Sequence, residues 1–190
     1  MSTNTLKASL ISGLNGEQHC IAALEILLDE VPYEKMSFRG RLVFQILLRS
    51  SLHRRKQFLQ FKEDNVHRLK PIQVRKPIFV TGLPRSGTTF LQNLLIRNFN
   101  IPGIPFWEII HPIPQFQNRL CDKTFRKIRA IILLKISKLL GPKIDPMHPV
   151  TLNSYEECWH LFLPTFHVYN FDLQLGISNY GRWISAHSIK

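Results

Sequence analysis

Apolar side chains recur with a helical period through the first third of the chain. Over residues 17–31 and again over 37–69 they return every three or four positions, as expected for helices that bury one face. Ser37 stands directly before the second run and is a residue type that caps helix N-termini. The pattern therefore predicts a helical N-terminal region over residues 1–70.

The pattern changes after Pro71. Residues 76–82 (KPIFVTG) form a short apolar and β-branched run, which predicts a buried strand with a proline near its start. Helical periodicity returns in three later segments, over residues 90–99, roughly 123–140 and roughly 155–162. Ser154 and Glu157 have the spacing of a capping box, so we expect them to start the last of these helices.

A glycine-rich turn, GLPRSGTT (residues 82–89), joins the predicted strand to the helix that follows it. In this arrangement the backbone N–H groups of the turn and the N-terminus of the helix converge on an anion. The two glycines are spaced as in a Walker A loop, but Thr88 stands where that loop has its lysine. Arg85 supplies a positive charge inside the turn instead, and its planar guanidinium suits a phosphate or sulfate group.

The turn resembles the 5′-phosphosulfate-binding loop of the sulfotransferase family in its G-x-P-R-S-G-T-[TS] form, and the similarity extends over roughly residues 71–170. The resemblance implies a P-loop-type three-layer α/β/α fold with a parallel sheet, of which residues 71–190 would be the N-terminal part. It implies transfer of a sulfuryl group from 3′-phosphoadenosine 5′-phosphosulfate (PAPS) to a hydroxyl or amine, with no metal. The residues implied to bind PAPS are Arg85, Ser86, Gly87, Thr88 and Thr89, with Arg85 also stabilising charge on the leaving phosphate.

The resemblance also has a limit. In the family an arginine and a serine further along the chain hold the 3′-phosphate of the nucleotide, and no strand leading to such a site is recognisable before Lys190. We therefore expect a chain that is truncated at its C-terminus relative to the family. Two other functions remain open, a non-catalytic remnant that binds an anion or a partner, and an atypical P-loop kinase.

Glu108, in PFWEIIHP, matches the position at which related sulfotransferases often carry a glutamate. A carboxylate there would accept the proton of the acceptor hydroxyl. The alternative is structural, an ion pair with a nearby Arg or Lys, or a helix cap. His111 is a rival base for which a structural role is favoured, and the same holds for His148.

The charge balance favours an anionic partner, since 25 Lys and Arg stand against 13 Asp and Glu. A nucleotide satisfies this excess, whereas no nucleic-acid-binding module is recognisable. The basic residues of 123–140, Arg126 among them, are expected on a solvated face; the Ile/Leu face of the same segment leaves peripheral membrane contact as a weaker option. The three cysteines follow no disulfide or zinc pattern, and neither a leader nor a run of about 18 apolar residues is evident, so we expect a cytoplasmic protein.

Overall fold

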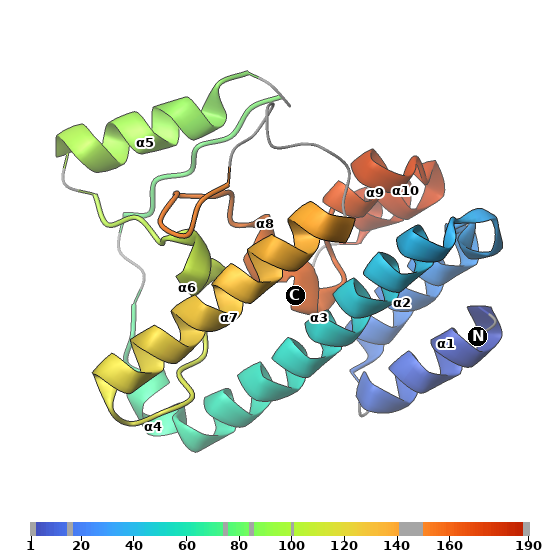
Figure 1. The fold of residues 1–190 in the computed structure, drawn as a ribbon, viewed down its shortest axis with the longest axis horizontal. Coiled ribbons are helices and arrows are strands. Elements are labelled where there is room, and N and C mark those ends of the chain that lie inside the picture. The colour runs from blue at the N-terminus through green and yellow to red at the C-terminus, as the bar shows by residue number, and fades with distance from the viewer. Residues whose placement is uncertain are drawn as a thin grey trace. The chain divides into compact units, whose positions relative to one another are not determined.

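The computed structural model describes residues 3–14, 17–73, 76–83, 86–99, 101–140 and 150–187 (Figure 1). Helices account for 71% of these described residues, and no strand is found among them. An isolated antiparallel bridge joins Pro105 to Tyr155. The chain divides into two compact units, Met1–Leu59 with Leu161–Lys190, and Gln60–His160.

The first unit is entirely helical where it is described. Its helices are α1 (Thr3–Ile11), α2 (Gln18–Glu30), α3 (Phe38–Asp64, as far as Leu59), α9 (Asn170–Leu175) and α10 (Ser178–Ala186), with the 3₁₀ helices η1 (Ser12–Leu14), η2 (Tyr33–Lys35) and η3 (Leu163–Thr165). In this unit α2 packs against α1 and α10, and α10 also packs against α9 (Figure 1).

The core of the first unit gathers around α2. Leu24, Leu27 and Leu28 of α2 are almost completely buried, as the apolar periodicity of this segment predicts. Tyr180 of α10 is also fully buried; its hydroxyl donates to the Phe166 carbonyl, and burial raises its pKa to about 12. The helices predicted over 17–31 and 37–69 are therefore confirmed as α2 and α3.

The cap predicted at Ser37 is also confirmed. α3 begins at Phe38, and the backbone N–H of Gly40 donates to Ser37 Oγ over 3.1 Å. The helical segment is not continuous to residue 69, because a turn at Asn65 separates α3 from the short α4 (Val66–Leu69).

The second unit contains the end of α3, α4, α5 (Thr88–Phe99), α6 (Phe106–Ile110) and α7 (Arg119–Leu140), while α8 (Trp159–Phe162) spans the boundary. α6 packs on α7 and buries Phe106, Trp107, Ile109 and Ile110. The N–H of Phe106 donates to the Ser154 carbonyl over 2.9 Å, which attaches the extended segment before α8 to the start of α6. α5 and α7 confirm the helices predicted over 90–99 and 123–140.

The predicted α/β/α fold is wrong for the part of the chain that the structure describes. Residues 77–82 are extended, but they pair with no other described segment, and Ile78 and Phe79 are 63% and 81% exposed. A strand exists only where a neighbouring strand completes its hydrogen-bond ladder. The β-branched sequence here favours extended backbone, yet no sheet forms around it.

The predicted capping box at Ser154 is wrong as well. α8 begins only at Trp159, and Ser154 lies in an earlier turn in which its Oγ accepts from the Thr151 N–H over 3.1 Å. The same hydroxyl lies 2.7 Å from Oε1 of Glu156, which is buried. Ser154 therefore serves the turn rather than a helix start.

Candidate functional site

The glycine-rich turn leads directly into α5. The N–H of Ser86 donates to the Leu83 carbonyl over 3.1 Å, and Gly87 follows with φ +87°, a backbone conformation that side chains with a Cβ rarely adopt. α5 then starts at Thr88, and the Leu91 N–H donates to the Gly87 carbonyl over 3.0 Å. Gly87 thus lets the chain reverse into the first turn of the helix. Pro84 and Arg85 lie outside the described residues.

Gly82 makes the turn tight. A Cβ at this position would lie 2.5 Å from Ser86 Oγ and 2.9 Å from Thr88 Cγ2, so a larger residue would push both side chains away. Ser86 and Gly87 are exposed, and Thr88 and Thr89 are partly exposed. The first N–H groups of an α-helix have no acceptor within the helix, and here they open to solvent beside these hydroxyls. The described part of the turn therefore fits a phosphate or sulfate group.

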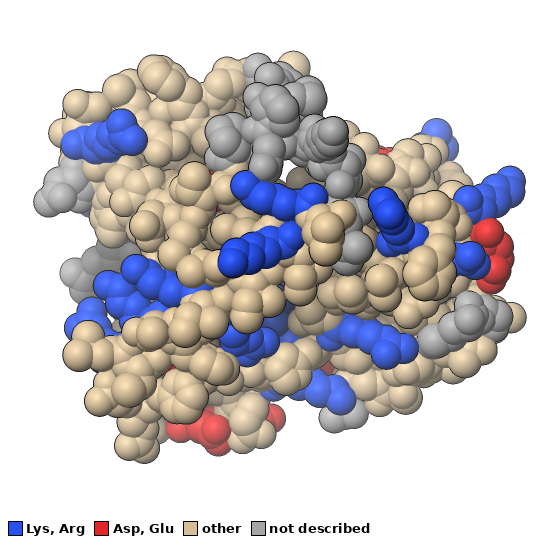
Figure 2. All heavy atoms as spheres, viewed as in Figure 1, with Lys and Arg blue, Asp and Glu red and all other residues tan. Residues whose placement is uncertain are grey.

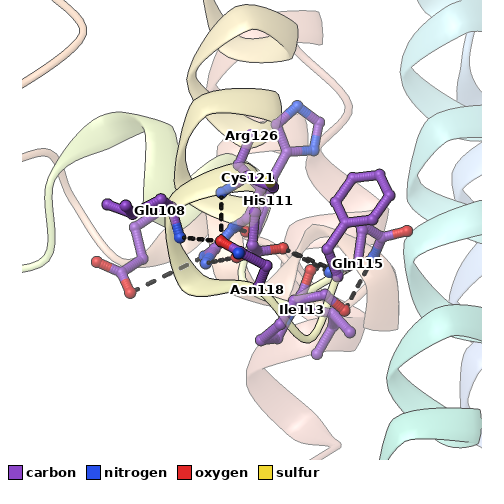
Figure 3. Close-up of polar contacts among 11 residues, drawn as sticks. Glu108, His111, Ile113, Gln115, Asn118, Cys121 and Arg126 are labelled. Carbon is purple, nitrogen blue, oxygen red and sulfur yellow. Dashed lines mark hydrogen bonds and ion pairs between the residues drawn. The ribbon is translucent and has the colours of Figure 1, made fainter.

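A second polar cluster lies between α6 and α7 and is centred on Arg126 (Figure 3). The Arg126 side chain is only 6% exposed; its Nη1 donates to Asp122 Oδ2 over 3.2 Å and its Nε donates to the His111 carbonyl. The guanidinium lies over the Trp107 ring, 4.9 Å from the centroid. Nη2 approaches Glu108 Oε1 to 3.9 Å. A single guanidinium thus connects α6, the loop after it and α7.

Asp122 is the counterion of this cluster. Its Oδ1 accepts from the N–H groups of Gln115 over 2.6 Å and Phe116 over 3.3 Å. Burial by itself raises the pKa of Asp122, but the hydrogen bonds from Gln115, Arg126 and Phe116 and the charge of Arg126 outweigh it, and the net pKa is lowered. Asp122 is therefore held as a carboxylate that fastens the loop before α7.

Asn118 sets the start of α7. Its Oδ1 accepts from the N–H groups of Leu120 over 3.0 Å and Cys121 over 3.1 Å, which is the geometry of a helix N-cap (Figure 3). The cap fixes the first turn of α7, on which Asp122 stands.

The structure places Glu108 in the first turn of α6, with its side chain 44% exposed and its carboxylate paired with Arg126. This is the ion pair that the sequence left open as the alternative to a catalytic base. Among the described residues, no hydrogen bond or ion pair joins Glu108 to Ser86, Gly87, Thr88 or Thr89. The catalytic assignment of Glu108 stays a prediction.

His111 ends α6, and its backbone carbonyl accepts the hydrogen bond from Arg126. This contact does not involve the imidazole, so the structural role favoured for the His111 side chain stays a prediction. His148 lies outside the described residues.

The prediction of a solvated face is wrong for Arg126, which the sequence grouped with the exposed lysines of the same helix. The available signal was its spacing from Asp122, since an acid four residues before a base favours an ion pair on a helix. That spacing does not say whether the pair is buried, which depends on the packing of Trp107 and the 111–116 loop against it.

The chain matches a model of the sulfotransferase family over residues 77–189, more than half of its 190 residues. The matched stretch contains the glycine-rich turn, Glu108 and the Arg126 cluster. No curated protein and no solved structure matches the chain. The match defines a class, enzymes that transfer sulfuryl groups. The chain belongs to the sulfotransferase family.

Proposed function

We propose that this protein transfers a sulfuryl group from PAPS to a hydroxyl or amine acceptor, with residues 82–89 binding the 5′-phosphosulfate. Membership of the family supports the reaction class. The observation that carries the site is the tight turn that ends at Gly87 and opens the N-terminus of α5 to solvent. Ser86, Thr88 and Thr89 line this opening and can donate hydroxyl hydrogen bonds to sulfate or phosphate oxygens.

In the proposed reaction the bond between sulfur and the bridging phosphate oxygen breaks as a bond forms from sulfur to the acceptor oxygen. The electron pair of the broken bond stays on the phosphate oxygen, where negative charge accumulates. Arg85 and the N–H groups at the start of α5 stabilise the negative charge on this phosphate oxygen. The acceptor proton passes to a base.

Glu108 is the proposed base. Its side chain is 44% exposed and its carboxylate lies 3.9 Å from Arg126 Nη2, so it remains accessible to an acceptor. Arg126 is itself buried and held by Asp122 and the His111 carbonyl, so it limits where the carboxylate can go. A base that is positioned in advance loses less freedom when the acceptor binds.

The first experiment measures nucleotide binding by calorimetry. The whole chain is titrated with adenosine 3′,5′-bisphosphate, and separately with ATP and magnesium. Selective binding of the bisphosphate is expected, and Arg85→Ala should weaken it roughly tenfold to a hundredfold, because a charge-assisted hydrogen bond to the phosphate is lost. The matched control is Arg97→Ala near the other end of α5, where the side chain is exposed. Equal affinities of the two variants for the bisphosphate would show that Arg85 does not bind the nucleotide. A preference of the chain for ATP with magnesium would favour a kinase.

The second experiment measures transfer of labelled sulfate from PAPS to a panel of phenols and alcohols. Glu108→Gln should lower turnover about 10²–10⁴-fold with little change in bisphosphate affinity, because it removes the proton acceptor and keeps the side-chain shape. Glu157→Gln, an exposed glutamate of the same unit, is the control. Full activity of Glu108→Gln would exclude it as the base. If the unmodified chain binds the bisphosphate but turns over no acceptor, the result would favour a non-catalytic anion-binding module.

A further inference from the structure

The outward face of α7 is apolar, and the side that faces the protein carries a charged pair. Leu120, Ile128, Ile132 and Leu139 are between 50% and 78% exposed, whereas Asp122, Arg126 and Ala130 are buried. An ordinary surface helix has the opposite arrangement, with its apolar stripe toward the core and its charges toward water. The exposed face also continues over Phe125, Ile131 and Ile136, so it runs along nearly the whole helix.

Every charged side chain of α7 other than the buried pair is basic. The acidic residue of this helix is Asp122, which is neutralised by Arg126. The basic residues are Arg119, Lys123, Lys127, Arg129, Lys135 and Lys138. Along the strip that α7 occupies in Figure 1, Figure 2 accordingly shows tan and blue side chains. The surface of α7 is therefore both apolar and positively charged.

The apolar face is open along its length and is not a closed groove. At its N-terminal end a shallow apolar hollow is lined by Phe116, Leu120, Cys121, Thr124, Phe125 and Ile128. Lys135 rises from within the apolar face, where its long aliphatic chain lets the ammonium reach a polar layer while neighbouring side chains are covered. Such a face fits an extended, planar surface.

The exposed apolar side chains and the basic residues of α7 together indicate which kind of partner binds this face. A nucleic acid would neutralise the lysines but would leave the isoleucines in water. A second copy of the chain would cover the isoleucines but would bring the same positive charges together. A lipid surface with anionic headgroups satisfies both, because the acyl boundary takes the apolar side chains and the headgroups lie at the level of the lysines.

We propose that α7 docks this protein on an anionic lipid surface, with its exposed Leu120–Leu139 face at the boundary between headgroups and acyl chains. The helix lies along the surface, because charged residues recur at almost every turn. None of the described helices is both long and apolar enough to cross a membrane. The proposal does not depend on the sulfuryl-transfer activity.

The test is co-sedimentation of the whole chain with vesicles of equal parts phosphatidylcholine and phosphatidylserine, and with vesicles of phosphatidylcholine alone. Binding to the mixed vesicles is expected to be much stronger. The double variant Ile128→Asp, Ile132→Asp should lower the partition by about tenfold or more, because it places charge in the apolar face. The matched control is Val66→Asp, Leu173→Asp, two apolar side chains of other helices that are 53% and 60% exposed. Circular dichroism checks that all variants keep their helices.

A second pair of variants tests the charges. Lys135→Gln, Lys138→Gln should lower binding to the mixed vesicles about thirtyfold, because each lysine near an anionic surface contributes about a fivefold gain in affinity. Lys62→Gln, Lys70→Gln removes the same net charge at exposed positions outside α7 and should have little effect.

Three outcomes would overturn the proposal. Equal binding to vesicles with and without phosphatidylserine would show that the positive charges of α7 do not drive binding. Equal losses of vesicle binding in the α7 variants and in their controls would show that α7 is not the surface that meets the lipid. If the protein dimerises without lipid, and Ile128→Asp, Ile132→Asp dissociates the dimer, then the face is covered by a second copy.

Discussion

α2 and α7 carry apolar stripes of similar regularity but present them in opposite directions. In α2, Leu24, Leu27 and Leu28 face the core and are at most 1% exposed. In α7 the buried side carries Asp122 and Arg126, and Ile132 is 51% exposed. An amphipathic pattern thus locates two faces on a helix, but it does not decide which face the protein covers.

The two helices are attached by different forces. α2 is held by removal of apolar surface from water, which is non-directional and scales with area. α7 packs on α6 through apolar side chains of α6 and also carries a buried ion pair within its own helix, Asp122–Arg126, whose desolvation cost is offset only when its hydrogen bonds are complete. Here they are nearly complete, since Asp122 accepts from two backbone N–H groups and Arg126 donates to a carbonyl. The attachment of α7 is therefore specific in geometry and sensitive to the loss of either partner.

The largest expected effect follows from cutting the ion pair. Arg126→Ala should lower the free energy of unfolding by about 3–5 kcal/mol, because it leaves the Asp122 carboxylate buried without its counterion. Urea unfolding followed by circular dichroism measures this. In the double variant Asp122→Ala, Arg126→Ala the loss should be smaller than the sum of the two single losses. Strict additivity would mean that the two side chains do not act as a pair.

A purely apolar deletion in α2 is next in size. Leu24→Ala should cost about 2–5 kcal/mol, since the side chain is 0% exposed and its removal leaves a cavity in the core around α2. The same urea titration applies. A cost below about 1 kcal/mol would contradict tight packing around α2.

The ion pair also predicts an acid-sensitive component of stability. The pKa of Asp122 is lower in the folded protein than the 3.8 of a free side chain, so its stabilising contribution is fully present above that value. The contribution is lost as the pH falls below about 4 and protons bind, first in the unfolded chain. Stability curves between neutral and acidic pH should therefore be flatter for Asp122→Asn than for the unmodified protein. Parallel curves would show that Asp122 has the same pKa in both states.

The smallest effect is expected on the exposed face of α7. Ile132→Ala should change the free energy of unfolding by less than about 0.5 kcal/mol, because a half-exposed side chain buries little surface and alanine favours helix. The losses of stability in Ile132→Ala and Leu24→Ala compare the exposed face of α7 directly with the buried face of α2. A loss as large as that of Leu24→Ala would show that this face is covered in solution.

Local sequence determined much of the helical structure. The apolar periods of α2, α3, α5 and α7 and the cap at Ser37 depend on neighbours within a few residues, so they could be predicted. The two glycines that shape the 82–89 turn were also recognisable, because the backbone at Gly87 requires a residue without a Cβ. The family resemblance followed from this same turn.

Tertiary structure alone decided the rest. Residues 77–82 have the composition of a strand, but a sheet needs a second segment at hydrogen-bonding distance, and propensity does not supply one. Arg126 is basic like its neighbours on α7, yet it is buried because Trp107, Asp122 and the loop that ends α6 converge on it. The direction in which α7 presents its isoleucines follows from that contact. Spacing along the chain gives the faces of a helix, and only packing between segments decides which of them meets water.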